Sequence, residues 1–80
     1  MTITVRFFAA ARAATGVAEV QTAAGALTEV LSQLQQQFPA FAAVAPRCSF
    51  LVDGLAATSP ADVVVAAGST VDVLPPFAGG

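Results

Sequence analysis

Residues 70–80 have the sequence Thr-Val-Asp-Val-Leu-Pro-Pro-Phe-Ala-Gly-Gly, which joins a predicted strand to an unusual tail. Polar and apolar side chains alternate over residues 70–74, a pattern typical of a half-buried strand with Val71 and Val73 facing a core. The Pro75-Pro76 pair fixes φ and lacks N–H donors, so the strand has to end there. The sequence therefore predicts a short tail that is mounted on a rigid strand.

Gly79 and Gly80 give this tail a thin tip, because residues without a Cβ let other backbones approach closely. We expect the Gly80 α-carboxylate to be ionised at neutral pH, since its reference pKa is about 3.5. A carboxylate threaded into a narrow channel can attack an activated phosphate or acyl group. The alternative is an ordinary frayed terminus. The Pro-Pro pair and Phe77 directly before the glycines favour a functional tip over this alternative.

The alternation of residues 2–7 predicts a first strand with Ile3, Val5 and Phe7 inward and Phe8 on the outer face. Phe8 is then either covered by a loop or open to a partner. Residues 9–16 are expected to be a connection, and residues 17–22 a second short strand.

From residue 26 the apolar period changes to that of a helix. Gly25 or Thr22 is predicted to cap its start, and Pro39 to end it. The positions that form one helical stripe are Leu27, Val30, Leu31, Leu34 and Phe38.

The second half of the chain predicts an apolar connection at 41–46 and a third strand at 48–52. Asp53-Gly54 is typical of a hairpin turn, because Gly accepts positive φ. A short apolar element follows at 63–65, before the closing strand. This order of elements predicts an α+β domain with one helix laid across one face of a sheet.

The composition fits one small domain of 80 residues without catalytic side chains of its own. His, Lys, Trp and Tyr are absent, which excludes a Ser-His-Asp or Cys-His nucleophile, the usual zinc sites and a Schiff base. A net charge of −2 without a basic cluster predicts no nucleic-acid partner. The lack of a bilayer-length apolar run and the single Cys48 predict a cytoplasmic protein without membrane association. Any acids and bases are therefore expected to come from another chain.

With the helix and the tail placed, the chain resembles the MoaD/ThiS family of small sulfur carriers, most closely the molybdopterin synthase small subunits within it. The resemblance spans the whole chain and is strongest over residues 71–80, with the opening residues 5–9, Arg12 and Gly16 also similar. Ala13 after Arg12, and Gly68-Ser69 before the last strand, depart from the usual pattern. The resemblance implies a ubiquitin-like β-grasp domain at 1–76 and a flexible Gly-Gly tail at 77–80.

The resemblance also implies a reaction. An E1-like enzyme uses ATP to adenylate the Gly80 carboxylate, which becomes a thiocarboxylate and donates sulfur to cyclic pyranopterin monophosphate in the large subunit of molybdopterin synthase. The implied assembly is a heterotetramer, and this chain itself is expected to bind no cofactor and no metal. The residues expected to form the tail or contact a partner are Gly80, Gly79, Ala78, Phe77, Pro76, Pro75, Leu74 and Phe8.

Three alternatives stay open from the sequence. The chain is a sulfur carrier for thiamine-thiazole or cysteine biosynthesis, a ubiquitin-like protein modifier joined through Gly80, or a plain interaction domain. Leu51 and Leu74 fall on the outward parity of their strands and are predicted either to form an apolar patch with Phe8 or to be covered.

Overall fold

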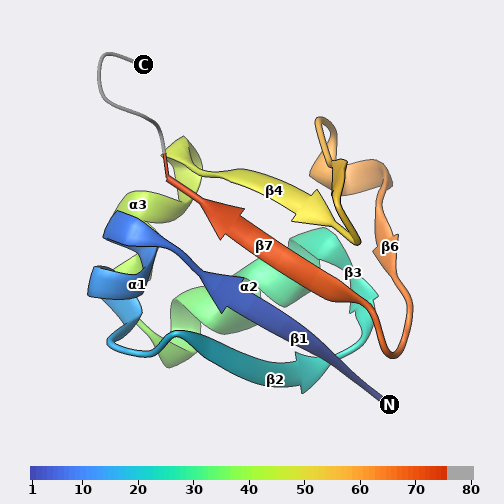
Figure 1. The fold of residues 1–80 in the computed structure, drawn as a ribbon, viewed down its shortest axis with the longest axis horizontal. Coiled ribbons are helices and arrows are strands. Elements are labelled where there is room, and N and C mark those ends of the chain that lie inside the picture. The colour runs from blue at the N-terminus through green and yellow to red at the C-terminus, as the bar shows by residue number, and fades with distance from the viewer. Residues whose placement is uncertain (76–80) are drawn as a thin grey trace.

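The computed structural model describes residues 1–75, which fold around a five-stranded mixed sheet (Figure 1). The strand order is β2-β1-β7-β4-β5, and only the β1–β7 pair is parallel. The bounds of these strands are β1 Thr2–Phe7, β2 Glu19–Ala23, β4 Ser49–Val52, β5 Leu55–Ala56 and β7 Thr70–Leu74. The strand that leads to the tail is therefore central, with hydrogen-bonded neighbours on both sides.

One long helix, α2 (Leu27–Gln37), covers one face of this sheet (Figure 1). Leu27, Val30 and Leu34 are buried against the core, as their helical spacing predicts. Leu31 and Phe38 are partly buried at the margin of the stripe. On the sheet side the core comprises the inward residues of the three central strands: Ile3, Val5, Phe7, Phe50, Val71 and Val73.

The start of α2 is held differently from the sequence prediction. No side chain caps the helix, so the capping roles predicted for Gly25 and Thr22 are wrong. The helix begins after Ala26, and its first N–H, that of Leu27, donates to the carbonyl of Val63 at 2.9 Å. The small sheet of β3 (Gly25–Ala26) and β6 (Val64–Val65) places this carbonyl beside the helix. A backbone partner thus does what a capping side chain usually does.

The predicted connection at 9–16 is mostly a helix, α1 (Ala9–Thr15). Alanine is the strongest helix former, which favours this segment even though Ala11 is its sole fully buried residue. The helix ends at Gly16, whose φ of 77° is left-handed and whose N–H donates to the Arg12 carbonyl at 2.8 Å. A large apolar stripe is missing here, and the prediction of a connection was wrong for this reason.

The predicted connection after α2 also contains helical turns, α3 (Phe41–Val44) and the 3₁₀ turn η1 (Ala45–Arg47). Phe41 is fully buried and packs edge-to-face on Phe7, with ring centroids 5.5 Å apart. This segment therefore closes the core below the end of α2, as its apolar character predicts. Figure 1 shows α1 and α3 gathered at the end of the sheet where β1 and β7 finish.

The predicted hairpin at Asp53-Gly54 is confirmed between β4 and β5. Asp53 and Gly54 have φ values of 50° and 83°, the positive pair that a tight two-residue hairpin requires. The 3₁₀ turn η2 (Pro60–Asp62) then leads to β6. Within residues 1–75 the longest helix, α2, is too short and too polar to cross a bilayer.

Candidate functional site

The end of β7 is the described part of the predicted tail mount. Leu74 is half-buried, pairs in register with Ser49 of β4, and is followed by a buried Pro75. The remaining predicted tail residues Pro76, Phe77, Ala78, Gly79 and Gly80 lie outside the described residues. The structure thus supplies a central strand and a buried proline directly before them.

Phe8 lies beside this end of β7, where β1 passes into α1. Its N–H donates to the Val73 carbonyl at 3.2 Å, and its own carbonyl accepts from Ala11 at 3.0 Å. Because both the N–H and the carbonyl of Phe8 are hydrogen-bonded, the backbone position is fixed while the side chain remains exposed to solvent. Phe8 is 39% exposed, which confirms the prediction that it faces outward.

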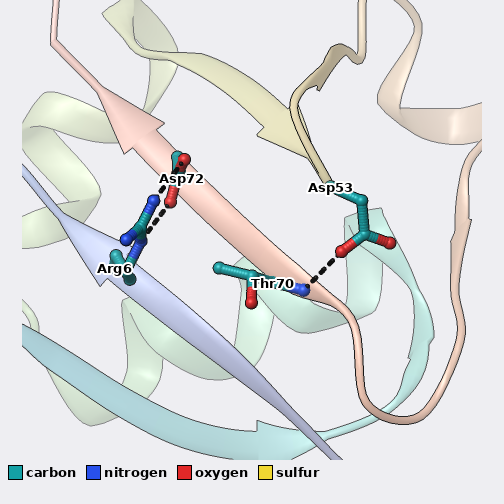
Figure 2. A network of polar contacts seen from close by, with 4 residues as sticks. All are labelled: Arg6, Asp53, Thr70 and Asp72. Atoms are coloured by element: carbon teal, nitrogen blue, oxygen red, sulfur yellow. Dashed lines mark hydrogen bonds and ion pairs between the residues drawn. The ribbon is translucent and has the colours of Figure 1, made fainter.

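Arg6 and Asp72 form a bidentate ion pair on the outer face of the sheet (Figure 2). Arg6 Nε donates to Asp72 Oδ1 at 2.6 Å, and Nη2 donates to Oδ2 at 2.9 Å. The two residues are register partners on the parallel strands β1 and β7. Hydrogen bonding and charge attraction from Asp72 raise the pKa of Arg6 above its ordinary value.

The same guanidinium also lies over the Phe8 ring, with Arg6 Cζ 5.6 Å from the ring centroid. The ion pair therefore orients Arg6, and Arg6 in turn supports the exposed aromatic side chain. The sequence alone does not identify the partner of Arg6. The alternation of side chains predicts that Arg6 and Asp72 both face outward, but it does not predict the register between β1 and β7.

Apolar side chains lie directly beside the ion pair on this outer face. Leu51 is paired in register with Asp72 from the β4 side, and both Leu51 and Leu74 are half-buried. With Phe8 they give the tail-proximal part of the outer face three apolar side chains, which we call the tail-proximal patch (Phe8, Leu51 and Leu74). The predicted outward parities are confirmed, with the two leucines partly covered.

Asp53 fixes the other end of β7. One of its carboxylate oxygens accepts the Thr70 N–H at 2.9 Å, and its own N–H donates to the Thr70 carbonyl at 2.8 Å (Figure 2). The hydrogen bond from the Thr70 backbone N–H, followed by one from the Ser69 side chain, holds the pKa of Asp53 below its ordinary value. The residue predicted to serve a turn thus also ties that turn to the strand carrying the tail.

The described residues offer little catalytic chemistry of their own. Cys48 is half-buried, its thiol donates to the Val44 carbonyl at 3.4 Å, and burial raises its pKa, which disfavours the reactive thiolate. Among residues 1–75, no three His, Cys, Asp or Glu side chains gather as metal ligands would.

A mixed sheet crossed by one main helix, with its last strand at the centre, is the ubiquitin-like β-grasp fold. The ThiS family model matches residues 5–80, so the chain belongs to the ThiS family of ubiquitin-like sulfur carriers. The match includes the predicted Gly-Gly tip. A search of curated proteins finds no match.

Solved structures share this fold at low identity. Small archaeal modifier protein 1 from Haloferax volcanii has a TM-score of 0.84 at 22% identity, with 100% of both chains covered. Its counterpart from Methanosarcina acetivorans has a TM-score of 0.88 at 21% identity, covering 99% of this chain and 96% of that one. A chain in the Helicobacter pylori complex of subunits 1 and 2 of molybdopterin-converting factor has a TM-score of 0.76 at 20% identity, with 100% of both chains covered.

Proposed function

We propose that this protein is the small, sulfur-donating subunit of a molybdopterin synthase. The observation that carries the proposal is the run from the central strand β7 through the buried Pro75 into Pro-Phe-Ala-Gly-Gly, within a chain of the ThiS family. Hydrogen bonds on both sides of β7 hold the mount rigid, as a precisely placed reactive group requires. The reacting group is the Gly80 carboxylate.

The chemistry proceeds in three steps outside the folded domain. An E1-like enzyme joins the Gly80 carboxylate to AMP from ATP with loss of pyrophosphate, which makes the carbonyl carbon electrophilic. A sulfur nucleophile then displaces AMP and leaves a thiocarboxylate. In the large synthase subunit this thiocarboxylate donates its sulfur to cyclic pyranopterin monophosphate, and water takes its place on the acyl carbon, which returns Gly80 to a carboxylate. Two such transfers complete the dithiolene. This scheme agrees with a domain that contributes a tail and leaves acids and bases to its partners.

The tail-proximal patch is the surface we assign to partner contact. Phe8 and Leu74 lie where β7 ends, and Leu51 pairs with Asp72 two residues earlier, so a partner that receives the tail also meets these side chains. An exposed aromatic side chain beside oriented charges is typical of the residues that anchor protein interfaces. The Helicobacter pylori complex supports a second, larger subunit as this partner.

Intact-mass measurement of the protein from cells that make molybdopterin tests the sulfur-carrier step. We expect a species with one terminal oxygen replaced by sulfur, and we expect Gly79→Ala to reduce it because a Cβ widens the threaded tip. Ala78→Gly is the matched control, since it changes the neighbouring residue without adding bulk. A terminus that stays fully unmodified in such cells contradicts the proposal.

Reconstitution with the large subunit tests the acceptor. We expect the thiocarboxylated chain to convert cyclic pyranopterin monophosphate to molybdopterin, and Phe8→Ala to weaken the complex between the two subunits. If the chain is thiocarboxylated but fails with this acceptor, the sulfur goes to a thiazole or cysteine pathway instead.

A protein-modifier role is the second candidate, favoured by the fold shared with two small archaeal modifier proteins. It predicts heavier conjugates joined through Gly80, visible as a ladder on blots against the tail. The chain has no lysine, so such conjugates cannot be lysine-linked chains of this protein. Conjugates without any thiocarboxylate-dependent molybdopterin synthesis would favour this role over the first.

A further inference from the structure

A mostly apolar groove lies between α2 and β4, and Leu51 belongs both to its lining and to the tail-proximal patch. It has a volume of about 530 Å³, and one long wall is the last turns of α2. Its other walls come from η1, β4 and the segment after β5, and its lining includes Leu31, Gln35, Cys48, Phe50, Ala57 and Pro60. We call it the α2–β4 groove. Its lining residues carry no charged side chain, so it suits an uncharged apolar occupant.

The groove opens next to the point where β7 ends. Ser49 lines the groove and is also the register partner of Leu74. Residues 76–80 follow the buried Pro75, and five residues reach about 16 Å when extended. The tail therefore begins beside the groove and is long enough to enter it.

Residues 76–80 also have the composition that the groove favours. Phe77 is their one large apolar side chain, and its neighbours Pro76 and Ala78 are small and uncharged. Phe77 follows Pro75 by two residues, so little chain has to be ordered to bring its ring to the groove. Pro76 reduces that ordering cost further, because its φ is already fixed.

We propose that in the free protein Phe77 docks in the α2–β4 groove and holds the tail against its own domain. A partner channel that admits Gly79-Gly80 has to draw Phe77 out of the groove. The docked form is thus a resting state, and access to the tail is governed by the exchange of Phe77 between two apolar sites. The proposal does not depend on Gly80 carrying sulfur, so it stands or falls separately from the proposed function.

Cys48 lines the groove and is the single thiol of the chain, so its reactivity reports whether the groove is occupied. We would measure the rate of Cys48 alkylation by N-ethylmaleimide, by intact mass, in the full-length protein and in Phe77→Ala. We expect Phe77→Ala to react about threefold faster, as it should if the docked state outweighs the open one by about two to one. Phe8→Ala, which removes an exposed ring from the other face, is the matched control and should react at the wild-type rate.

Equal rates in the wild type and Phe77→Ala would overturn the proposal, as would equal acceleration in both variants, which indicates general loosening. Protection of Cys48 that disappears on dilution would assign the groove to a second copy and also overturn it. A second measurement is independent of thiol chemistry: nuclear Overhauser contacts between the Phe77 ring and the Leu31 and Ala57 methyl groups are expected, and their absence contradicts docking.

Discussion

Replacing Val73 by alanine should sharply destabilise the domain, because this side chain lies at the centre of the strand that carries the tail. Val73 is fully buried, with Phe7 and Phe50 as its register partners on the two neighbouring strands. Since strands flank it on both sides and α2 covers it, the surrounding structure has little freedom to collapse into the space left behind.

The magnitude follows from the groups removed. Loss of two buried methyl groups costs about 1.6 kcal/mol in transfer free energy. A residual cavity of ~40 Å³ adds about 1 kcal/mol at about 24 cal/mol per Å³. The sum of about 2.5 kcal/mol is a substantial part of the roughly 4–12 kcal/mol expected for a domain of this size. The corresponding fall in melting temperature is roughly 10–20 °C.

Urea denaturation followed by circular dichroism measures this change, with Val64→Ala as the matched control. Val64 is also a strand valine but is 76% exposed, so its truncation should cost less than about 0.5 kcal/mol. A Val73→Ala cost below about 1 kcal/mol, or equal costs for the two variants, would refute the assignment of Val73 to a tightly packed core.

Three further changes test the local features around β7. Ala9 has a φ of 47°, which glycine adopts without penalty, so Ala9→Gly should raise the free energy of unfolding by about 1 kcal/mol; a lower value in urea denaturation would contradict this. The pKa of Asp53 is lowered in the folded state, so its contribution is present at neutral pH and is lost as pH falls through that lowered pKa. Asp53→Asn should therefore be less stable than the wild type at pH 7, with a gap that closes in strong acid; a gap independent of pH rules out the ionised carboxylate as its source. In a double-mutant cycle, Arg6→Ala and Asp72→Ala should cost less together than the sum of the single changes, and additive costs would show that the ion pair contributes no coupling.

The sequence was most informative where side-chain period and turn chemistry act locally. The alternation in residues 2–7 and 70–74 predicts β1 and β7, and the stripe beginning at Leu27 predicts α2. Each of these elements has a repeating apolar pattern because only one of its faces is buried in the core. The Asp53-Gly54 turn was equally predictable, because positive φ at two successive positions strongly selects these residue types.

What the sequence did not predict depends on contacts between distant segments. Helix α1 has no stripe of large apolar residues, so its alanines could not be told from a connection. The start of α2 depends on a hydrogen bond from the Leu27 N–H to the Val63 carbonyl. These two residues are 36 positions apart in the sequence. The Arg6–Asp72 ion pair depends on the parallel pairing of β1 with β7, and the sequence of neither strand by itself specifies that pairing.

The fold assigns different tasks to the two ends of β7. At its start, Asp53 ties the β4–β5 turn to Thr70, and at its finish the strand passes between Phe8 and Ser49. Two apolar surfaces that share Leu51 therefore adjoin the point where the tail begins: the tail-proximal patch on the outer face, and the α2–β4 groove between α2 and β4. A partner that covers the tail-proximal patch and receives Gly80 in a channel competes with the α2–β4 groove for Phe77. The affinity of such a partner should then rise when the groove is blocked, for example by a bulky adduct on Cys48, whereas a groove that never holds Phe77 would leave that affinity unchanged.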